Sequence, residues 1–366
     1  MEHACFSQLR KKRKIILNNN SEKSVENDKA RKNSEAESFP ENQHLKTITK
    51  VNKRTEVFTL AAAKEISESQ QSIIRAKIIS KLPNSAFTKH IFGRHNPINV
   101  QRNESKITDA EKEAIKTIFQ LQESELMETI KNFNVNSLKN CCQDTIIKLS
   151  KYLQQICENT KLWYAYWHEE RQYRITGSIC YNLYTYTKNT KANWKKKCND
   201  TFTPKNFKSE YTEYGKKTEG EARDAFKKKT SKEVIETGLV VSQQNPWLAY
   251  SPDGVIFKDG RPTELLEIKC PFKGKTMTIE DTVNNEVGKS LIKDKENIYL
   301  KEKHRYYGQV QLGMAVLNLK STLFVIYSTF DKNLFILRVN RNEIFLTTML
   351  KELKKYTMAL CCMKSV

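Results

Sequence analysis

The chain has 366 residues, of which 38% are hydrophobic, enough for one sizeable core or for a core with a smaller helical domain. Its 63 lysines and arginines outnumber its 42 aspartates and glutamates, which gives a formal net charge of +21. This excess favours a polyanionic partner, because basic side chains placed against phosphates release condensed counterions. The sequence has no apolar run long enough to cross a bilayer, so we expect no membrane partner.

Two further features bear on the cellular compartment. The nine cysteines show no C-x-x-C spacing, and the six histidines do not lie at zinc-ligand spacing from them, so we expect reduced thiols and no zinc site. The N-terminal residues lack the apolar segment of a secretion signal. The basic run from Arg10 to Lys14 is of the kind that nuclear import receptors or phosphates recognise, although solvated tails also carry such runs. We therefore expect an intracellular protein, located in the nucleus.

The N-terminal part of the chain divides into two segments. Residues 1–58 are polar and cannot bury enough apolar surface to offset their ordering entropy, so we predict a disordered basic tail. Residues 59–160 show helical spacing of apolar residues, and Thr108 with Glu111 forms a capping box that opens one helix. We predict a helical accessory region there, which could dock a partner, mediate oligomerisation or add DNA-binding surface.

Residues 161–366 are predicted to form an α/β domain, because helical and strand patterns are mixed along them. The aromatic cluster from Trp163 to Trp167 is interpreted mainly as core, with base stacking as the alternative. Residues 273–300 form a long, charged segment. The main predicted elements are helices over 214–228 and 301–318, a strand over 233–242, a hairpin that turns at Lys258-Asp259-Gly260, and strands over 322–328 and 334–339.

The hairpin brings charged residues into an apolar strand, where an unpaired charge is costly. Glu267 and Lys269 alternate with Leu266 and Ile268, so the period of two puts both charged residues on one face of the strand. If Asp253 begins the neighbouring strand, its carboxylate lies beside that of Glu267. Two carboxylates that face one gap repel each other unless a cation lies between them, and oxygen ligands favour Mg²⁺ or Mn²⁺ over zinc.

Such a group has the chemistry of phosphodiester cleavage. A metal held by two carboxylates can polarise a phosphate and lower the pKa of a bound water. Lys269 beside it could orient or deprotonate that water and offset charge on the transition state. The competing interpretation is a Glu–Lys pair on a solvated hairpin face. The turn Ser251-Pro252-Asp253-Gly254, at hairpin distance before the pair, favours the metal site.

Three other segments accompany the hairpin in a fixed order. The four segments are Trp167-His168-x-x-Arg171 with Ile175-Thr176-Gly177-Ser178, Gly215-x-x-x-Glu219-x-x-Ala222-Arg223, Ser251-Pro252-Asp253-Gly254 with Leu265-Leu266-Glu267-Ile268-Lys269-Cys270-Pro271, and Tyr306-Tyr307-Gly308-Gln309-Val310-Gln311. Together they resemble the YqaJ-like viral recombinase and phage lambda exonuclease family of PD-(D/E)XK nucleases. The resemblance spans about residues 163–330, with Gly177 in place of the usual Ala. It implies a restriction-endonuclease-like core, which is a mixed β-sheet flanked by helices.

This resemblance implies roles for the hairpin residues. Asp253 and Glu267 would hold the metal together with the backbone carbonyl of Ile268. Lys269 would activate the attacking water. Mg²⁺ is the implied cofactor, and Mn²⁺ could substitute for it.

The resemblance also implies roles for residues outside the hairpin. Glu219 would be an outer metal or water ligand, although an i,i+4 pair with Arg223 also explains it. Arg171 and Ser178 would bind a DNA phosphate, such as a 5′-terminal one, although Arg171 could equally form a surface ion pair. Gln309 would approach the catalytic lysine or the water, or else be a polar residue of an amphipathic helix.

The function implied is that of a Mg²⁺-dependent deoxyribonuclease, a 5′–3′ exonuclease acting on duplex DNA ends in recombination or repair. The alternatives are an endonuclease or RNA-active nuclease with the same site, and a catalytically idle DNA-binding factor derived from a virus or mobile element. The implied partners are a single-strand annealing protein and further copies of the chain. The lysines at 195–197 and 227–229 are candidates for phosphate contacts or belong to solvated surface.

Overall fold

The structure is a computed structural model that describes residues 68–82, 85, 107–131, 147–202 and 209–364. All of them lie in one compact unit that spans 63–366. The predicted tail, residues 1–58, lies outside the described residues, and the predicted accessory region is described in part. Within the described ranges, no helix has both the length and the apolar character needed to span a membrane.

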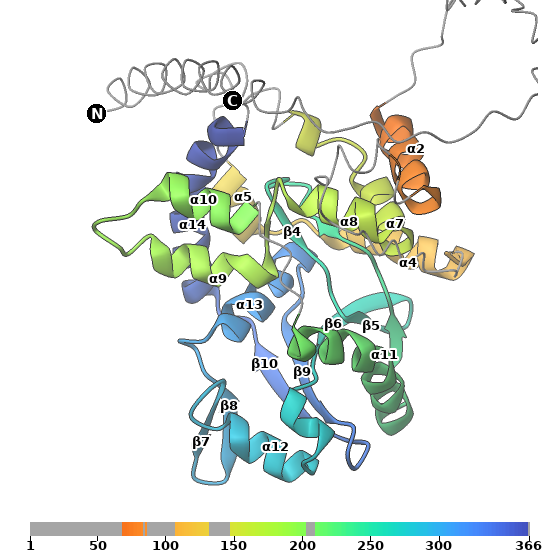
Figure 1. The fold of residues 1–366 in the computed structure, drawn as a ribbon, viewed down its shortest axis with the longest axis vertical. Coiled ribbons are helices and arrows are strands. Elements are labelled where there is room, and N and C mark those ends of the chain that lie inside the picture. Colours follow the sequence, from red (N-terminus) through yellow and green to blue (C-terminus); the bar gives the residue numbers. More distant parts are fainter. Residues whose placement is uncertain (1–67, 83–84, 86–106, 132–146, 203–208, 365–366) are drawn as a thin grey trace, which may run out of the picture. The chain divides into compact units, whose positions relative to one another are not determined.

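A five-stranded mixed sheet forms the centre of the fold, with the strand order β10-β9-β6-β5-β2 (Figure 1). Strands β6 and β9 pair in parallel, and the other neighbours pair antiparallel. The predicted turn between β5 and β6 is confirmed, because Asp259 and Gly260 have φ angles of 52° and 72°, as a tight two-residue hairpin requires. The strands are β2 (Glu233–Ile235), β5 (Gly254–Lys258), β6 (Arg261–Lys269), β9 (Ser321–Ser328) and β10 (Asn333–Asn340).

Helices cover both faces of this sheet. Those nearest the candidate site are α11 (Glu210–Thr230) and α13 (Arg305–Leu317). Phe226 of α11 packs in one cluster with Leu266, whereas Leu265, on the opposite face of β6, lies against α13. The alternation predicted for β6 is therefore confirmed, as is the predicted α/β class with a mixed sheet flanked by helices.

Shorter elements surround this core. A small sheet has the order β1-β4-β3, and the charged segment 273–300 contains η2, α12 and the hairpin β7–β8, which the sequence pattern did not predict. The predicted capping box is confirmed, because the side chains of Thr108 and Glu111 each accept from the other's backbone N–H at the start of α4. The bounds are α2 (Glu68–Lys81), α4 (Asp109–Leu121), α5 (Glu125–Lys131), α7 (Leu153–Leu162), α8 (Tyr164–Arg171), α9 (Gly177–Tyr186), α10 (Trp194–Phe202), α12 (Ile279–Glu286), α14 (Glu343–Lys364), the 3-10 helix η2 (Phe272–Lys275), β1 (Ile175–Thr176), β3 (Val240–Val241), β4 (Leu248–Tyr250), β7 (Leu291–Asp294) and β8 (Asn297–Leu300).

The single strand predicted over 233–242 is wrong, because its two ends belong to β2 and β3 in different sheets. Gly238 lies so close to α7 that a Cβ atom would be 2.0 Å from the carbonyl oxygen of Cys157. The backbone N–H of Leu239 donates to Thr160 Oγ1 at 2.7 Å. These contacts with α7 draw the chain away from the first sheet before it enters the second.

Gly313 sets how closely α13 approaches the sheet, since a Cβ there would lie 2.6 Å from both Leu265 Cδ2 and Tyr250 Cζ. We expect Gly313→Ala to lower the free energy of unfolding by about 1–3 kcal/mol, the usual cost of overpacking a core. Gly220→Ala is the control, because a Cβ there meets nothing within 4 Å and alanine favours a helix by up to about 1 kcal/mol. Urea unfolding measures both changes. Equal stabilities of the two variants would contradict the close packing.

Candidate active site

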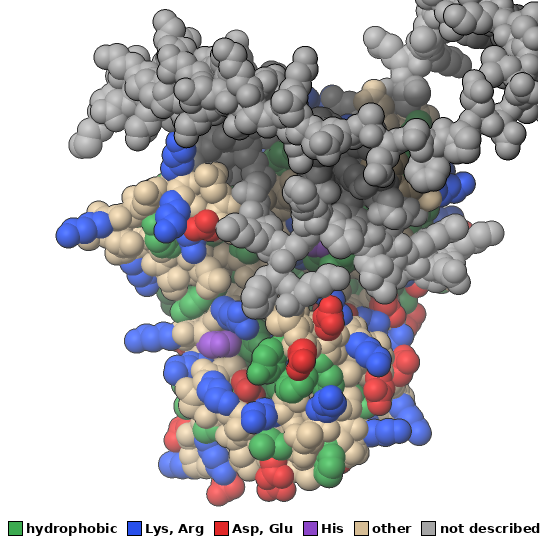
Figure 2. All heavy atoms as spheres, in the orientation of Figure 1, with side chains coloured by type: hydrophobic (Ala, Val, Ile, Leu, Met, Phe, Trp, Pro, Cys, Tyr) green, Lys and Arg blue, Asp and Glu red, His purple; other side chains and the backbone are tan. Residues whose placement is uncertain are grey.

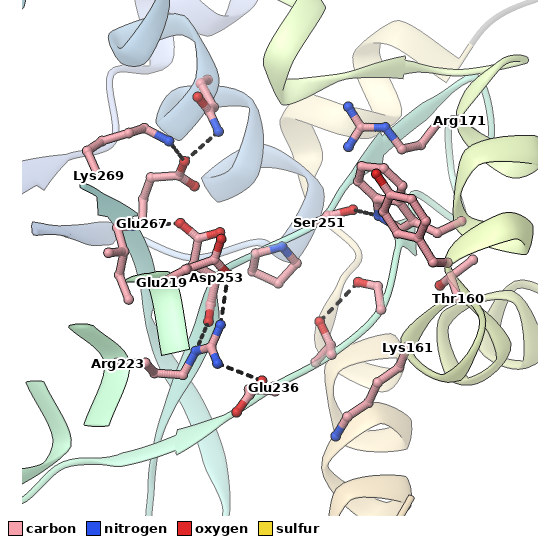
Figure 3. Close-up of a pocket in the computed structure, with 17 residues that line it drawn as sticks. Thr160, Lys161, Arg171, Glu219, Arg223, Glu236, Ser251, Asp253, Glu267 and Lys269 are labelled. Carbon is pink, nitrogen blue, oxygen red and sulfur yellow. Dashed lines mark hydrogen bonds and ion pairs between the residues drawn. The ribbon is translucent and has the colours of Figure 1, made fainter. Parts of the chain in front are cut away.

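The structure brings the predicted catalytic residues together around one pocket of about 810 Å³ (Figure 3). The pocket lies where the hairpin β5–β6 ends. Asp253 directly precedes β5, and Glu267 and Lys269 lie at the end of β6. Helix α11 contributes Glu219, and α13 contributes Gln309. Residues that are distant in the sequence therefore face a common space.

Glu267 is a buried carboxylate that accepts hydrogen bonds from three side chains. Its exposed fraction is 1%. Tyr250 donates its hydroxyl to Glu267 Oε2 at 2.5 Å, and Lys269 Nζ and Gln309 Nε2 both donate to Oε1. A buried carboxylate without such donors would be strongly destabilising, so these three groups permit Glu267 to lie in the sheet. Gln309 thus contacts the same oxygen as the lysine that it was predicted to approach.

Tyr250 is a site residue to which the sequence analysis gave no role. It ends β4, and its ring packs so closely on two helices that a Cβ at Gly177 or Gly313 would lie 2.5 Å or 2.6 Å from ring atoms. Burial and the neighbouring charge of Glu267 raise the pKa of Tyr250 well above its ordinary value, so its hydroxyl stays protonated. The available signal was its place three residues before Asp253, since a buried tyrosine needs a partner for its hydroxyl.

The carboxylate of Asp253 faces the pocket from the turn before β5. Its Oδ2 accepts from the backbone N–H of Ile268 at 2.6 Å, which ties the turn to β6. Burial, followed by the charges of Glu267 and Glu219, raises the pKa of Asp253 well above its ordinary value, and Lys269 only partly opposes this shift. Burial and the two neighbouring carboxylates thus both disfavour the charged form of Asp253.

Lys269 is a cation at neutral pH. Burial opposes its charge, but the carboxylates of Glu267 and Asp253 outweigh that effect and raise the pKa of Lys269 above its ordinary value. Its Nζ also lies 5.0 Å from the centre of the Tyr306 ring. The ammonium group is therefore held in place on two sides.

Arg223 joins three parts of the pocket wall (Figure 3). Its Nε donates to the carbonyl oxygen of Asp253 at 2.7 Å, its Nη2 donates to Glu219 at 2.8 Å, and its Nη1 pairs with Glu236 at 2.7 Å. The i,i+4 pair considered for Glu219 is therefore present, yet Glu219 also lines the pocket. The contacts with Asp253 and Glu236 had no sequence signal, because they join distant segments.

The donor set of the pocket suits a divalent cation. Within the described residues, no three or more His, Cys, Asp or Glu side chains form a ready metal-binding cluster. Mg²⁺, however, commonly uses one or two carboxylates and keeps several waters, so Asp253, Glu267 and one backbone carbonyl would suffice. Repulsion among Asp253, Glu267 and Glu219 contributes to the raised pKa of both Asp253 and Glu219, beside the effect of burial. A cation between these oxygens would relieve that repulsion.

Arg171 lies at another end of the pocket (Figure 3). Its Nη2 donates to Ser178 Oγ at 2.7 Å and to Thr176 Oγ1 at 3.3 Å, which places Ser178 beside the pocket. Burial lowers the pKa of Arg171 to about 10, so the guanidinium stays charged at neutral pH. Among the described residues, no carboxylate forms an ion pair with Arg171. The alternative considered from the sequence, a surface ion pair, is therefore not seen in this part of the chain.

The aromatic cluster is divided between core and pocket. Tyr166 is buried, as the core interpretation predicts, whereas Tyr164 and Trp167 line the pocket. Their rings stack with centroids 5.5 Å apart and an interplanar angle of 15°. The guanidinium of Arg171 lies 4.0 Å from the centre of the Trp167 ring, and Trp167 Nε1 donates to Ser251 Oγ at 2.8 Å. Trp167 therefore links Arg171 to the turn that carries Asp253.

The fold and this pocket define an α/β protein with a carboxylate–lysine site at the end of a hairpin. Residues 166–322 match the model of the YqaJ-like viral recombinase domain, the family that the four sequence segments resemble.

Solved structures of exonucleases are similar to part of the chain. An alkaline exonuclease (LHK-Exo) from Laribacter hongkongensis is 23% identical, with a TM-score of 0.40, over 54% of this chain and 93% of its own. LHK-Exo in complex with dAMP is 22% identical, with a TM-score of 0.40, over 53% and 91%. A phage related exonuclease from Haemophilus somnus 129PT is 13% identical, with a TM-score of 0.33, over 52% and 97%. Among curated proteins there is no significant match.

Arg223→Ala should lower the free energy of unfolding by about 1–3 kcal/mol, because it leaves a backbone carbonyl and a partly buried carboxylate without their donor. Glu236→Gln is the control and should cost less than about 1 kcal/mol, since the side chain of Glu236 is 44% exposed. Urea unfolding at neutral pH measures both. If the two variants lose equal stability, the bonds of Arg223 to Asp253 and Glu219 do not brace the pocket.

Proposed function

We propose that the chain is a metal-dependent DNA nuclease, a 5′–3′ exonuclease that acts on duplex ends in recombination or repair. One observation carries this proposal: Asp253, Glu267 and Lys269 converge in a pocket whose other end holds Arg171. The acidic end suits a metal ion, and the basic end suits a phosphate. The YqaJ-like domain at 166–322 supports a role in recombination, and the net charge of +21 supports a nucleic acid substrate.

We propose Mg²⁺ as the cofactor, with Mn²⁺ as a substitute. Asp253, Glu267 and the backbone carbonyl of Ile268 would hold it. When bound, the ion would polarise the scissile phosphate and favour deprotonation of a water. Glu219 would occupy an outer position, where its carboxylate accepts a hydrogen bond from a water while Arg223 fixes its direction.

Lys269 and Gln309 would assist through the hydrogen bonds that they donate. Because neighbouring carboxylates keep Lys269 protonated, we propose that its ammonium orients the attacking water and offsets negative charge on the phosphate as the bond to the leaving oxygen breaks. Gln309 donates to the same oxygen of Glu267. Its amide would keep Glu267 in position when Lys269 turns toward the substrate.

Arg171 and Ser178 would bind the 5′-terminal phosphate. A planar guanidinium can donate two parallel hydrogen bonds to a phosphate. The hydroxyl oxygen of Ser178 lies 2.7 Å from Nη2 of Arg171, so both side chains could contact the same phosphate. Recognition of a terminal phosphate would restrict cleavage to strand ends. If Arg171 instead contacts an internal phosphate, the same pocket would serve an endonuclease.

The nuclear location, the annealing-protein partner, self-association and the domain boundaries after residues 58 and 160 stay predictions from the sequence. None of them is needed for the chemistry proposed at the pocket.

Lys269→Ala should slow cleavage of linear duplex DNA with Mg²⁺ by at least about 100-fold, because the lysine stabilises charge that develops in the transition state. Affinity for DNA should change by less than about threefold, since that charge is absent from the ground state. The matched control is Lys258→Ala, an exposed lysine on β5, which should retain activity. Gel assays of products and fluorescence anisotropy with EDTA measure the two properties.

Unchanged cleavage by Lys269→Ala would contradict the role proposed for this residue. The variant Asp253→Ala should also give no cleavage. Addition of EDTA should abolish cleavage by the wild type. Products from circular duplex DNA would favour the endonuclease, and products from RNA would favour the RNA-active nuclease. DNA binding without any Mg²⁺- or Mn²⁺-dependent product would favour the catalytically idle DNA-binding factor.

The wild type should degrade 5′-phosphorylated ends at least about tenfold faster than 5′-hydroxyl ends, because charge-assisted hydrogen bonds contribute about 1.5–3 kcal/mol. Arg171→Ala should remove this preference, and Ser178→Ala should reduce it. Arg261→Ala, an exposed arginine at the start of β6, is the control. Initial rates of mononucleotide release on the two substrates provide the test. Equal rates for the wild type would show that Arg171 does not read the strand end.

A further inference from the structure

A basic arm extends from the phosphate-binding end of the pocket. We use this name for residues 177–199, which comprise α9, the loop after it and the first part of α10. The arm contains five lysines and no aspartate or glutamate, although acidic residues number 42 in the 366 of the chain. Figure 1 shows the loop of the arm projecting from the fold, and Figure 2 shows Lys and Arg side chains along this region. The arm therefore places five lysines in one stretch beside the proposed site, before Asp200 follows in α10.

The lysines of the arm carry charge that the protein does not itself neutralise. Lys188 lies 4.8 Å from the centre of the Tyr184 ring and Lys197 lies 5.0 Å from that of Tyr186, so aromatic faces hold two of them in place. Across the part of the chain that the structure describes, none of the five forms an ion pair with a carboxylate. Their charge is available to a partner.

Three of these lysines occupy positions that are electrostatically unfavourable for a cation. Residues 195–197 lie in the first turn of α10, which has no acidic residue there. The positive end of the helix dipole disfavours cations at this place. The other lysine triplet, 227–229, lies in the last turn of α11, where cations are favourable, and Lys229 donates to the carbonyl oxygen of Leu334. The second triplet stabilises its own helix, whereas the first is unfavourable unless an anion approaches.

The position of the arm indicates which kind of anion its lysines would bind. Ser178, in the first turn of α9, accepts a hydrogen bond from Arg171, and the helix leads from there toward the lysines. Its ten residues rise about 15 Å, which equals about four to five base-pair steps of ~3.4 Å. We propose that the basic arm binds the phosphate backbone of the duplex, about four to five base pairs from the end held at Arg171. This inference rests on the proposed function for its substrate.

The test compares two variants that remove the same charge from different helices. One variant carries Lys195→Ala, Lys196→Ala and Lys197→Ala, and the control carries Lys227→Ala, Lys228→Ala and Lys229→Ala. Figure 1 shows α10 and α11 well separated in the fold. Fluorescence anisotropy measures the affinity for a 5′-phosphorylated linear duplex, with EDTA, over a series of salt concentrations. The arm variant loses three unfavourable charges from a helix start and one favourable contact, that of Lys197 with the Tyr186 ring, so it should fold about as stably as the wild type.

The arm variant should bind the duplex at least about tenfold more weakly at low salt, and its slope of log affinity against log salt should fall by up to about 0.9 per lost phosphate contact. The control should keep the affinity and slope of the wild type. Equal affinities for the arm variant and the wild type would overturn the inference. So would unchanged duplex binding with lost affinity for a poly-glutamate peptide, which would indicate an acidic protein partner instead.

These outcomes separate the inference from the proposed function. If the wild type binds duplex DNA through the arm but gives no metal-dependent product, the nuclease proposal fails and the arm inference stands. If the wild type cleaves duplex ends and the arm variant binds and cleaves as well as it does, the arm inference alone fails.

Discussion

The need to stabilise one buried carboxylate, that of Glu267, constrains much of the surrounding structure. A carboxyl group buried in the central strand of a sheet is tolerated only when polar partners meet its oxygens. Here the donors come from three elements: Tyr250 from β4, Lys269 from β6 and Gln309 from α13. The small sheet, the central sheet and a covering helix are therefore positioned relative to one another by bonds to the same two oxygens. These three bonds hold the carboxylate of Glu267 at one place in the pocket wall.

The ring of Tyr250 explains where the helices need glycine. A Cβ at Gly177 would lie 2.5 Å from the ring. Gly313 on α13 meets the same ring from another helix. The two glycines thus have one cause, which is room for a large side chain whose hydroxyl reaches Glu267. The chemistry of the site in this way dictates residues that never touch the pocket.

Features encoded by near neighbours in the chain could be predicted from the sequence. The alternation that puts Glu267 and Lys269 on one face, the turn at Gly260 and the capping box at Thr108 depend on a few adjacent residues, and the structure has all three. The bond from Arg223 to Asp253 joins segments that no periodicity relates. The strand break at Gly238 likewise depends on contacts with α7, and the alternation of residues within 233–242 carries no information about that helix.

Trp167 links the two places where a DNA strand would be held and cut. One face of its indole supports the guanidinium of Arg171, and its N–H is bonded to Ser251, two residues before Asp253. Under the proposed function, a phosphate held at Arg171 and a phosphate cleaved at Asp253 would both be positioned by contacts of this one side chain. The ring would then fix the distance between the bound strand end and the cleaved bond. The length of the released fragment would be a property of the protein, independent of the base sequence that passes through it.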